Sequence, residues 1–441
     1  MTMLGQTAAE LGRAIDKGRI HPVELVEAQL DAIDKHPLAG RIYARLTPKR
    51  ARAEAMAAAG RVKAGLRRGL LDGVPVSWKD LFDTAGVATE AGTALLRRRV
   101  PERDALVLER ATFQGLVCLG KTHMTELAFS GLGINPVTAS PPCINDPGAA
   151  PGGSSSGAAA SVAFGLAPAA IGSDTGGSVR IPAAWNDLVG LKTTSGLLPL
   201  DGVVPLCERF DTIGPIARSV EDCALLLGQL QGAAPPDLGG VALAGARLMV
   251  LETVALDDLR PAPEMAFDHS VARLIAAGAT VERLVAPEVA EAMSLAGILF
   301  TAEAYAIWRD KIEAAPEKMF PRILERFRSG ASFTAADYVA AWRRLEELRR
   351  IWAARVATAD AVILPTSPIL PPNANRLMTD DAYFVTENLL ALRNTRIGNL
   401  MGSCVLTLPA GEPSCGISLM APAFAEARLL RLGAAVEAAL R

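Results

Sequence analysis

The chain has 441 residues, half of them hydrophobic, and a formal net charge of −2 at pH 7. This apolar content allows a large buried core, and the basic residues are too scattered to form the positive surface of a nucleic-acid-binding protein. The amino terminus has no signal-peptide pattern, and the most apolar window, residues 157–172, is interrupted and shorter than the ~20 residues of a membrane span. We therefore expect a protein of the reduced cytoplasm with neither a membrane nor a direct nucleic-acid partner.

Helical and strand patterns alternate through the first third of the chain. Apolar residues recur at helical spacing over residues 7–34, with a break at residues 18–22, and residues 51–65 form an alanine-rich helical segment. Residues 73–78 and 116–120 have the pattern of short strands, and residues 104–115 between them are amphipathic. This alternation is typical of an α/β protein.

The same alternation continues to the carboxyl terminus. Ser219 is a helix cap ahead of a helix predicted over residues 220–230. Residues 303–357 are mostly helical in pattern, 368–381 form a Pro/Asn-rich loop, and 424–440 a last helix. Strands are predicted at residues 189–191, 212–215, 247–251, 280–284 and 361–365.

No internal repeat or linker divides the chain, so we expect one domain over residues 1–441. Within it we distinguish amino-terminal helices (1–65), a catalytic core (70–230) and a helical region that shapes the pocket (300–357). The six cysteines have no metal-ligand spacing and are expected to be buried free thiols. No metal and no cofactor are expected.

Two Gly-Gly-Ser turns place Ser154 and Ser178 in a distinctive context. The first turn is Pro-Gly-Gly-Ser-Ser-Ser-Gly at residues 151–157, and the second is Gly-Ser-Asp-Thr-Gly-Gly-Ser-Val-Arg at residues 172–180. Glycines let a hydroxyl and neighbouring N–H groups face one small volume, which suits a nucleophile beside oxyanion donors. Ser178 is the candidate nucleophile, although an isolated Gly-Gly-Ser turn is more often an ordinary helix cap. The candidate donors are Thr175, Gly176 and Gly177.

A nucleophilic serine needs a base, and the chain has only four histidines. His123 alone lies near a distinctive stretch, so a Ser-His-Asp triad is poorly supported. Lys79 ends a predicted strand and becomes the candidate base, because burial lowers a lysine pKa toward neutrality. The alternative is a surface lysine at a strand end.

Residues 152–182 together with the segment Val-Ser-Trp-Lys-Asp-Leu-Phe-Asp at 76–83 resemble the amidase signature family of serine hydrolases. The resemblance extends over most of the chain, including residues 189–194, 211–219 and 399–411. It implies a single large mixed, twisted β-sheet flanked by helices on both faces. It also implies a triad in which Lys79 is the base, Ser154 a relay after a cis peptide bond, and Ser178 the nucleophile.

The resemblance also suggests supporting residues. Ser155 is expected to hydrogen-bond Lys79, and Asp174 with Arg180 to brace the oxyanion turn as an ion pair. Candidate pocket residues are Met124, Thr125, Glu126 and Phe129, although aromatic or apolar residues there are more often core than substrate contacts. Further candidates are the loop 139–151 and Tyr305, Trp308 and Arg344, for which side-chain packing is an equal explanation. The chain departs from the family pattern at several positions that include Trp78, Ser156, Thr193 and Ser195.

Three functions are compatible with this pattern. The first is a stand-alone amidase that cleaves a small or medium carboxamide through an acyl-enzyme, as a monomer or a homodimer. The second is the amidase-like subunit of a glutamine-dependent tRNA amidotransferase, for which the chain is somewhat short. The third is a binding protein that keeps the fold without turnover, which the retention of Lys79, Ser154 and Ser178 together speaks against.

Overall fold

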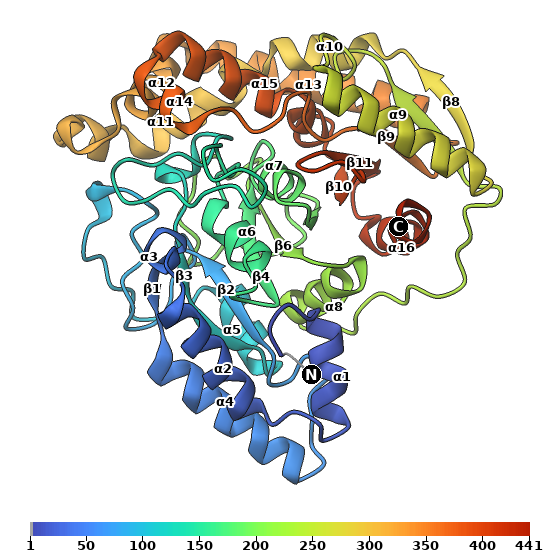
Figure 1. Cartoon of the computed structure of the whole chain (residues 1–441). Coiled ribbons are helices and arrows are strands. Elements are labelled where there is room, and N and C mark those ends of the chain that lie inside the picture. The colour runs from blue at the N-terminus through green and yellow to red at the C-terminus, as the bar shows by residue number, and fades with distance from the viewer. Residues whose placement is uncertain (1–2) are drawn as a thin grey trace.

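One mixed sheet of eleven strands runs through the molecule (Figure 1). The computed structural model describes residues 3–441. The strand order is β1-β3-β2-β4-β6-β5-β10-β11-β9-β7-β8, with parallel and antiparallel neighbours, which confirms the predicted α/β class and mixed sheet. The strands are β1 (Tyr43–Leu46), β2 (Pro75–Lys79), β3 (Val117–Thr122), β4 (Ala169–Asp174), β5 (Val189–Lys192), β6 (Thr212–Ala217), β7 (Arg247–Leu251), β8 (Thr280–Leu284), β9 (Ala361–Pro365), β10 (Cys404–Pro409) and β11 (Gly416–Ala421).

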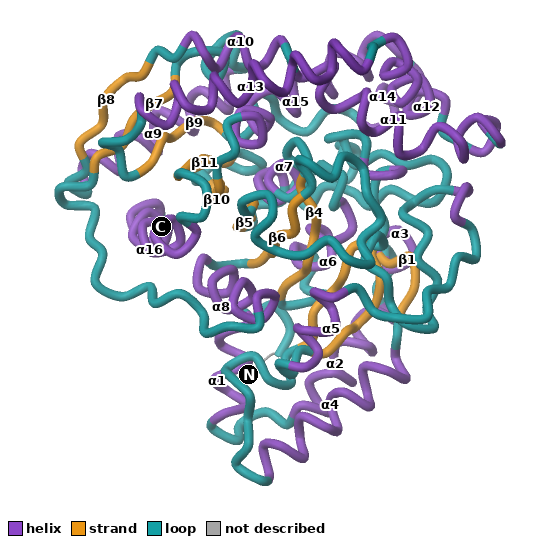
Figure 2. The backbone as a smooth tube through the Cα atoms, turned by 180° about the vertical axis from the view of Figure 1, so that it is seen from behind, coloured by secondary structure: helices purple, strands orange, loops and turns teal. Residues whose placement is uncertain are grey.

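Helices cover both faces of this sheet (Figure 2). The amino-terminal and core helices are α1 (Ala8–Asp16), α2 (Pro22–Lys35), α3 (Ala39–Ile42), α4 (Pro48–Lys63), α5 (Leu106–Phe113), α6 (Ser156–Ala163), α7 (Arg180–Trp185) and α8 (Val220–Gln231). The later helices are α9 (Pro261–Ala276), α10 (Pro287–Ser294), α11 (Ala296–Ala314), α12 (Pro321–Arg328), α13 (Ala335–Arg355), α14 (Ala374–Thr379), α15 (Asp381–Leu400) and α16 (Glu426–Leu440).

Side-chain alternation in the central strands decides which helices they contact. In β4, Ala170 belongs to a buried cluster with the small residues of α6 and α7, whereas Ala169 and Ile171 belong to the main core. On the other side of the sheet, α8 and α16 pack against β5, β6 and β10. Because adjacent residues of β4 point to opposite faces of the sheet, β4 is buried on both sides.

The helices α10 to α15 form an outer layer on one side of the sheet, along the top of Figure 1. Residues 287–314 have the length and hydropathy of a membrane-crossing helix, but such a segment is weak evidence, since helices of soluble proteins share these properties. In this structure the segment is divided into α10 and α11, which contact each other and α13. All six cysteines are buried free thiols, as predicted.

The structure confirms several predicted elements and corrects others. The bounds of β7, β8 and β9 match the predicted strands, and the Ser219 hydroxyl caps α8 by accepting from the Asp222 N–H at 3.1 Å. Residues 303–357 are mostly helical, as predicted. They divide into the end of α11, α12 and α13, with Pro316, Pro321 and Gly330 in or beside the breaks. The predicted loop 368–381 was wrong in part, since α14 forms within it.

Gly214 in β6 tests how closely the central strands approach. A methyl group on Gly214 would lie 1.8 Å from the Leu191 carbonyl oxygen, so Gly214→Ala must push β5 and β6 apart. We expect it to destabilise the fold by roughly 3 kcal/mol or more. Gly60→Ala, at an exposed helical site with no atom near the new methyl, should instead be neutral or stabilise by up to about 1 kcal/mol. Urea unfolding of both variants checks this, and equal stabilities would contradict it.

Candidate active site

The amine of Lys79 lies at the carboxyl end of β2, buried between two serine hydroxyls. Its Nζ is 2.7 Å from Ser154 Oγ and 2.8 Å from Ser173 Oγ, and both Lys79 and Ser154 are fully buried. In β2, Lys79 alternates with Trp78, which packs into the main core. Lys79 therefore points to the opposite face of the sheet, toward the glycine-serine run that precedes α6.

That run approaches the neighbouring backbone closely. A methyl group on Gly153 would lie 2.6 Å from the Gly133 nitrogen and 2.7 Å from Thr125 Oγ1, so only glycine fits there. The peptide bond between Gly153 and Ser154 is cis. The α6 helix then begins at Ser156, two residues after the serine that contacts the lysine.

The pKa of Lys79 is lowered from its ordinary value to about 7. Burial is the main cause, because it disfavours the charged form, and the carboxylates of Asp174 and Asp211 oppose it only in part. Two other buried lysines differ in their contacts. Lys121 pairs with Asp80 at 3.1 Å, and Lys192 donates to the Thr193 and Ser403 carbonyls. Lys79 is thus the one of these three whose amine contacts serine hydroxyls.

The turn between β4 and α7 is shaped around the Asp174 carboxylate. Asp174 accepts from the Gly177 and Val179 N–H groups at 2.8 and 3.1 Å, while Thr395 Oγ1 donates to the Gly176 carbonyl at 2.7 Å. Gly177 has a φ of 136°, and a methyl group on it would meet Thr395 Oγ1 at 2.1 Å. The turn therefore needs glycine at this position.

Arg180 holds Asp174 in a buried ion pair. Its Nε and Nη2 each donate to this carboxylate at 2.9 Å, and Nη2 also donates to Asn399 Oδ1 at 2.6 Å. Burial alone would raise the pKa of Asp174, but the Arg180 charge and its hydrogen bonds lower it well below the ordinary value. The carboxylate is thus engaged by Arg180 and by the turn, and makes no ion pair with Lys79.

Ser178 follows this turn and reaches a small cavity of about 20 Å³, here called the inner pocket. Its lining includes Thr175, Gly176 and Ser178 and the rings of Phe129 and Phe300. Ser178 is 3% exposed, and Lys79 and Ser154, both fully buried, do not line the pocket.

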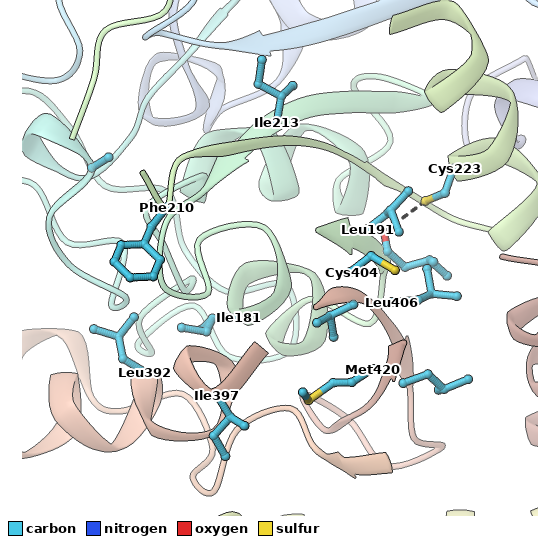
Figure 3. Close-up of a cluster of buried hydrophobic side chains, with 14 of the residues drawn as sticks. Ile181, Leu191, Phe210, Ile213, Cys223, Leu392, Ile397, Cys404, Leu406 and Met420 are labelled. Atoms are coloured by element: carbon cyan, nitrogen blue, oxygen red, sulfur yellow. Dashed lines mark hydrogen bonds between the residues drawn. The ribbon is translucent and has the colours of Figure 1, made fainter. Parts of the chain in front are cut away.

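A larger cavity of about 650 Å³, the outer cavity, adjoins the inner pocket. The two share Phe300, Arg326 and Arg396, and the outer cavity extends between α11, α12 and α15. Leu392 of α15, which lines the inner pocket, lies near Ile181 of α7 (Figure 3). The outer cavity therefore adjoins the small pocket that Ser178 lines.

The structure brings most of the predicted site residues together. The Asp174–Arg180 ion pair forms as expected. Ser155 does not contact Lys79: its hydroxyl bonds the Ser173 backbone, and the Ser173 hydroxyl contacts the amine instead. The Gly177 N–H is directed to Asp174, so of the three expected oxyanion donors only Thr175 and Gly176 line the inner pocket.

Of the predicted pocket residues, one lines a cavity and the others do not. Phe129 lines the inner pocket, whereas Met124, Thr125 and Glu126 are buried beside the glycine-serine run or α12 and line neither cavity. Glu126 accepts from Thr93 Oγ1 and the Phe320 N–H, both at 2.8 Å, and burial raises its pKa to about 7.

The more distant candidates lie elsewhere. Trp308 donates to the Pro205 carbonyl, Arg344 pairs with Glu291 and Glu347, and Tyr305 bonds Glu313. None of these three residues, nor the loop 139–151, lines the inner pocket or the outer cavity. Trp78, an unusual residue beside the lysine, packs edge-on against Phe82 with 5.3 Å between ring centroids, on the side away from the site.

Sequence reasoning missed Ser173, Phe300, Arg326 and Arg396. Ser173 lies within the signature and in β4 beside Lys79, so strand pairing is the signal that finds it. The arginines carried no distinguishing signal, since α12 alone contains three of them. Within residues 3–441, no three His, Cys, Asp or Glu side chains gather as a metal site requires.

Comparisons with known proteins agree with this geometry. The family model described as Amidase matches residues 24–430. The chain is 34% identical to 2-amino-5-chloromuconic acid deaminase of Comamonas testosteroni, over 95% of each chain. It is 32% identical to a subunit of the glutamyl-tRNA(Gln) amidotransferase of Thermobifida fusca, covering 100% of this chain and 96% of that one.

Comparison with solved structures also finds similarity to amidases. A crystal structure of an amidase superposes with a TM-score of 0.87 at 30% identity, covering 98% of this chain and 99% of the other. The match in sequence and in fold thus extends over nearly the whole chain. The chain therefore belongs to the amidase family and is a hydrolase of carbon–nitrogen amide bonds.

Proposed function

We propose that this protein cleaves the C–N bond of a small or medium carboxamide through an acyl-enzyme on Ser178. The observation that carries the proposal is the contact of 2.7 Å between Ser154 Oγ and the buried Lys79 amine, whose pKa is near 7. An amine with this pKa has a free lone pair in much of the protein at neutral pH, which a general base requires.

The proposed proton path begins at the contact between Lys79 and Ser154 and continues to Ser178. Lys79 takes the Ser154 hydroxyl proton, Ser154 takes that of Ser178, and Ser178 Oγ bonds to the amide carbon. The negative charge on the carbonyl oxygen is stabilised by main-chain N–H groups at the turn formed by Thr175 and Gly176. The proton then returns along the path to the leaving nitrogen as the C–N bond breaks, and water releases the acid and restores the Ser178 hydroxyl.

The amidase-like component of a glutamine-dependent tRNA amidotransferase is the second candidate. It is favoured by the relative from Thermobifida fusca, which is named for that enzyme and matches along its length. The two functions differ in what the purified chain does alone. Hydrolysis of simple amides without another protein supports the stand-alone amidase, and activity that appears only with partner subunits supports the amidotransferase.

The cellular compartment and the oligomeric state are also part of the proposal. We expect a cytoplasmic protein, because the six cysteines are all free thiols. A homodimer stays a prediction that light scattering of the purified protein tests.

Labelling with a fluorophosphonate probe tests the nucleophile. The probe should bond to Ser178 Oγ with loss of fluoride, and mass spectrometry should find it there in the wild type. Ser178→Ala should abolish both labelling and amide hydrolysis, while its circular dichroism spectrum stays that of the wild type. Ser154→Ala should slow labelling by about a hundredfold or more, since the proton path is broken.

Ser156→Ala is the matched control for these variants. Ser156 belongs to the same run, but its hydroxyl bonds the His123 carbonyl at 3.4 Å and does not contact the lysine. It should therefore keep wild-type labelling. Label on another residue, or equal loss in all three serine variants, would sink the assignment.

The depressed pKa of Lys79 predicts a pH-dependent stability. Lys79 has a pKa of about 7 when folded and about 10.5 when unfolded, so between these values the unfolded chain binds the extra proton. Folding stability therefore rises with pH in this window by up to about 1.4 kcal/mol per pH unit and is lowest below pH 7. Lys79→Met removes this dependence.

Subtracting the free energy of unfolding of Lys79→Met from that of the wild type at each pH leaves the contribution of Lys79, because the other titrating groups are present in both proteins. Urea unfolding from pH 7.5 to 9.5 should show the wild type gaining stability relative to Lys79→Met. Parallel curves would mean that the folded amine stays protonated throughout this range.

A further inference from the structure

Two arginines face the inner pocket without an acidic partner. Arg326 of α12 and Arg396 of α15 both line it together with Ser178, and both also line the outer cavity. No ion pair or side-chain hydrogen bond joins either guanidinium to another residue in the part of the chain that the structure describes. Arg326 Nη1 is buried there with no hydrogen-bond partner.

The two guanidinium groups lie close to the nucleophile turn and to each other. A methyl group on Gly176 would be 3.6 Å from Arg396 Cγ and 4.0 Å from its Nε. Arg326 stacks over Phe129 with its Cζ 4.5 Å from the ring centroid, and Arg396 Cζ is 6.0 Å from that of Phe300. After burial, the charge of Arg396 is the next cause that lowers the pKa of Arg326.

The other arginines of α12, and Arg180 of α7, are paired with acids, whereas Arg393 of α15 makes no ion pair within residues 3–441 but lines neither cavity. Arg180 beneath the pocket pairs with Asp174, Arg322 of α12 with Asp381, and Arg328 of α12 with Glu313. Taking a charge out of water without a partner is unfavourable, and two like charges side by side add repulsion. Burial lowers the pKa of Arg396 to about 10, so this side chain stays charged at neutral pH. The protein thus keeps two unneutralised guanidinium groups beside Ser178.

We propose that Arg326 and Arg396 together bind a carboxylate of the substrate, so that the amide cleaved is one that also carries an acid group, such as a half-amide of a dicarboxylic acid. This inference rests on the proposed function of Ser178. It adds the substrate class, which the proton path alone leaves open.

A carboxylate fits these observations well. The guanidinium fork matches the two oxygens of a carboxylate, and such bonds are among the strongest in proteins when water is excluded. The inner pocket, at about 20 Å³, has room for one small group beside Ser178, and the outer cavity of about 650 Å³ has room for the rest of the substrate. Acidic side chains of the outer cavity do not compete, because Asp381 is paired with Arg322 and Glu325 is exposed.

The first experiment compares acid and neutral amides. Malonamate, succinamate and glutaramate are tested against the neutral diamides malonamide, succinamide and glutaramide. The best acid amide should have a kcat/KM at least tenfold above that of its neutral counterpart. Equal or better hydrolysis of the neutral series would overturn the proposal.

Binding to the Ser178→Ala variant tests the same point without turnover. Calorimetric titration should give a Kd for the best acid amide that rises at least tenfold when Arg326→Met or Arg396→Met is added. Arg328→Met is the matched control, because it lies on the same helix and pairs with Glu313 outside both cavities, and it should leave this Kd unchanged. An unchanged Kd in the first two variants contradicts the proposal, as does tighter binding of inorganic phosphate than of the acid amide.

Thermal unfolding separates ligand binding from a structural role. Because neither arginine has an acidic partner to lose, Arg396→Met should melt at the wild-type temperature or above it. A lower melting temperature with an unchanged Kd would assign the arginine to the fold instead. Arg396→Lys keeps the charge and serves if the methionine variant does not fold. Since the titration needs no catalysis, absence of amide hydrolysis would sink the proposed function while the binding result still decides this inference.

Discussion

The buried contact between the Lys79 amine and two serine hydroxyls is the constraint on which the site depends. A charged Lys79 would lose its hydration on burial and would gain no ion pair with a carboxylate in return. This is why the pKa of Lys79 falls to about 7. The nearby carboxylates are occupied elsewhere. Asp174 is held by Arg180, and Asp211 accepts from Thr175 Oγ1 and from two backbone N–H groups. A direct ion pair to either would have kept the lysine charged.

Arg180 connects this site to the outer helical layer. It bonds Asp174 of the turn, and it also donates to the Thr395 carbonyl and the Asn399 side chain of α15. The same helix positions Thr395 against the turn and Arg396 in the pocket. One buried hydrogen-bond network therefore positions both the turn and Arg396. This explains why the predicted residues Asp174 and Arg180 contact α15, a helix that was not predicted.

The sequence was enough to predict the central sheet and the residues around the lysine, because glycine turns, short apolar runs and a family signature are local patterns. Arg326 and Arg396 could not be found in this way. They lie far apart in sequence, on helices whose arginines look alike, and only packing decides that Arg322 and Arg328 meet acids while Arg326 meets a phenylalanine ring. The Ser155 error has a similar cause, since the packing at the end of β4 brings Ser173 to the amine instead.

The most direct measurement is the rate at which Ser178 reacts with a fluorophosphonate as a function of pH. If a neutral Lys79 activates Ser178 through Ser154, the rate constant should rise with a midpoint near pH 7 and level off above about pH 8. The rise should be lost in Lys79→Met, with the plateau about a hundredfold lower or more. A rate that climbs without a midpoint up to about pH 10, or one unchanged by removal of the lysine, would contradict the account.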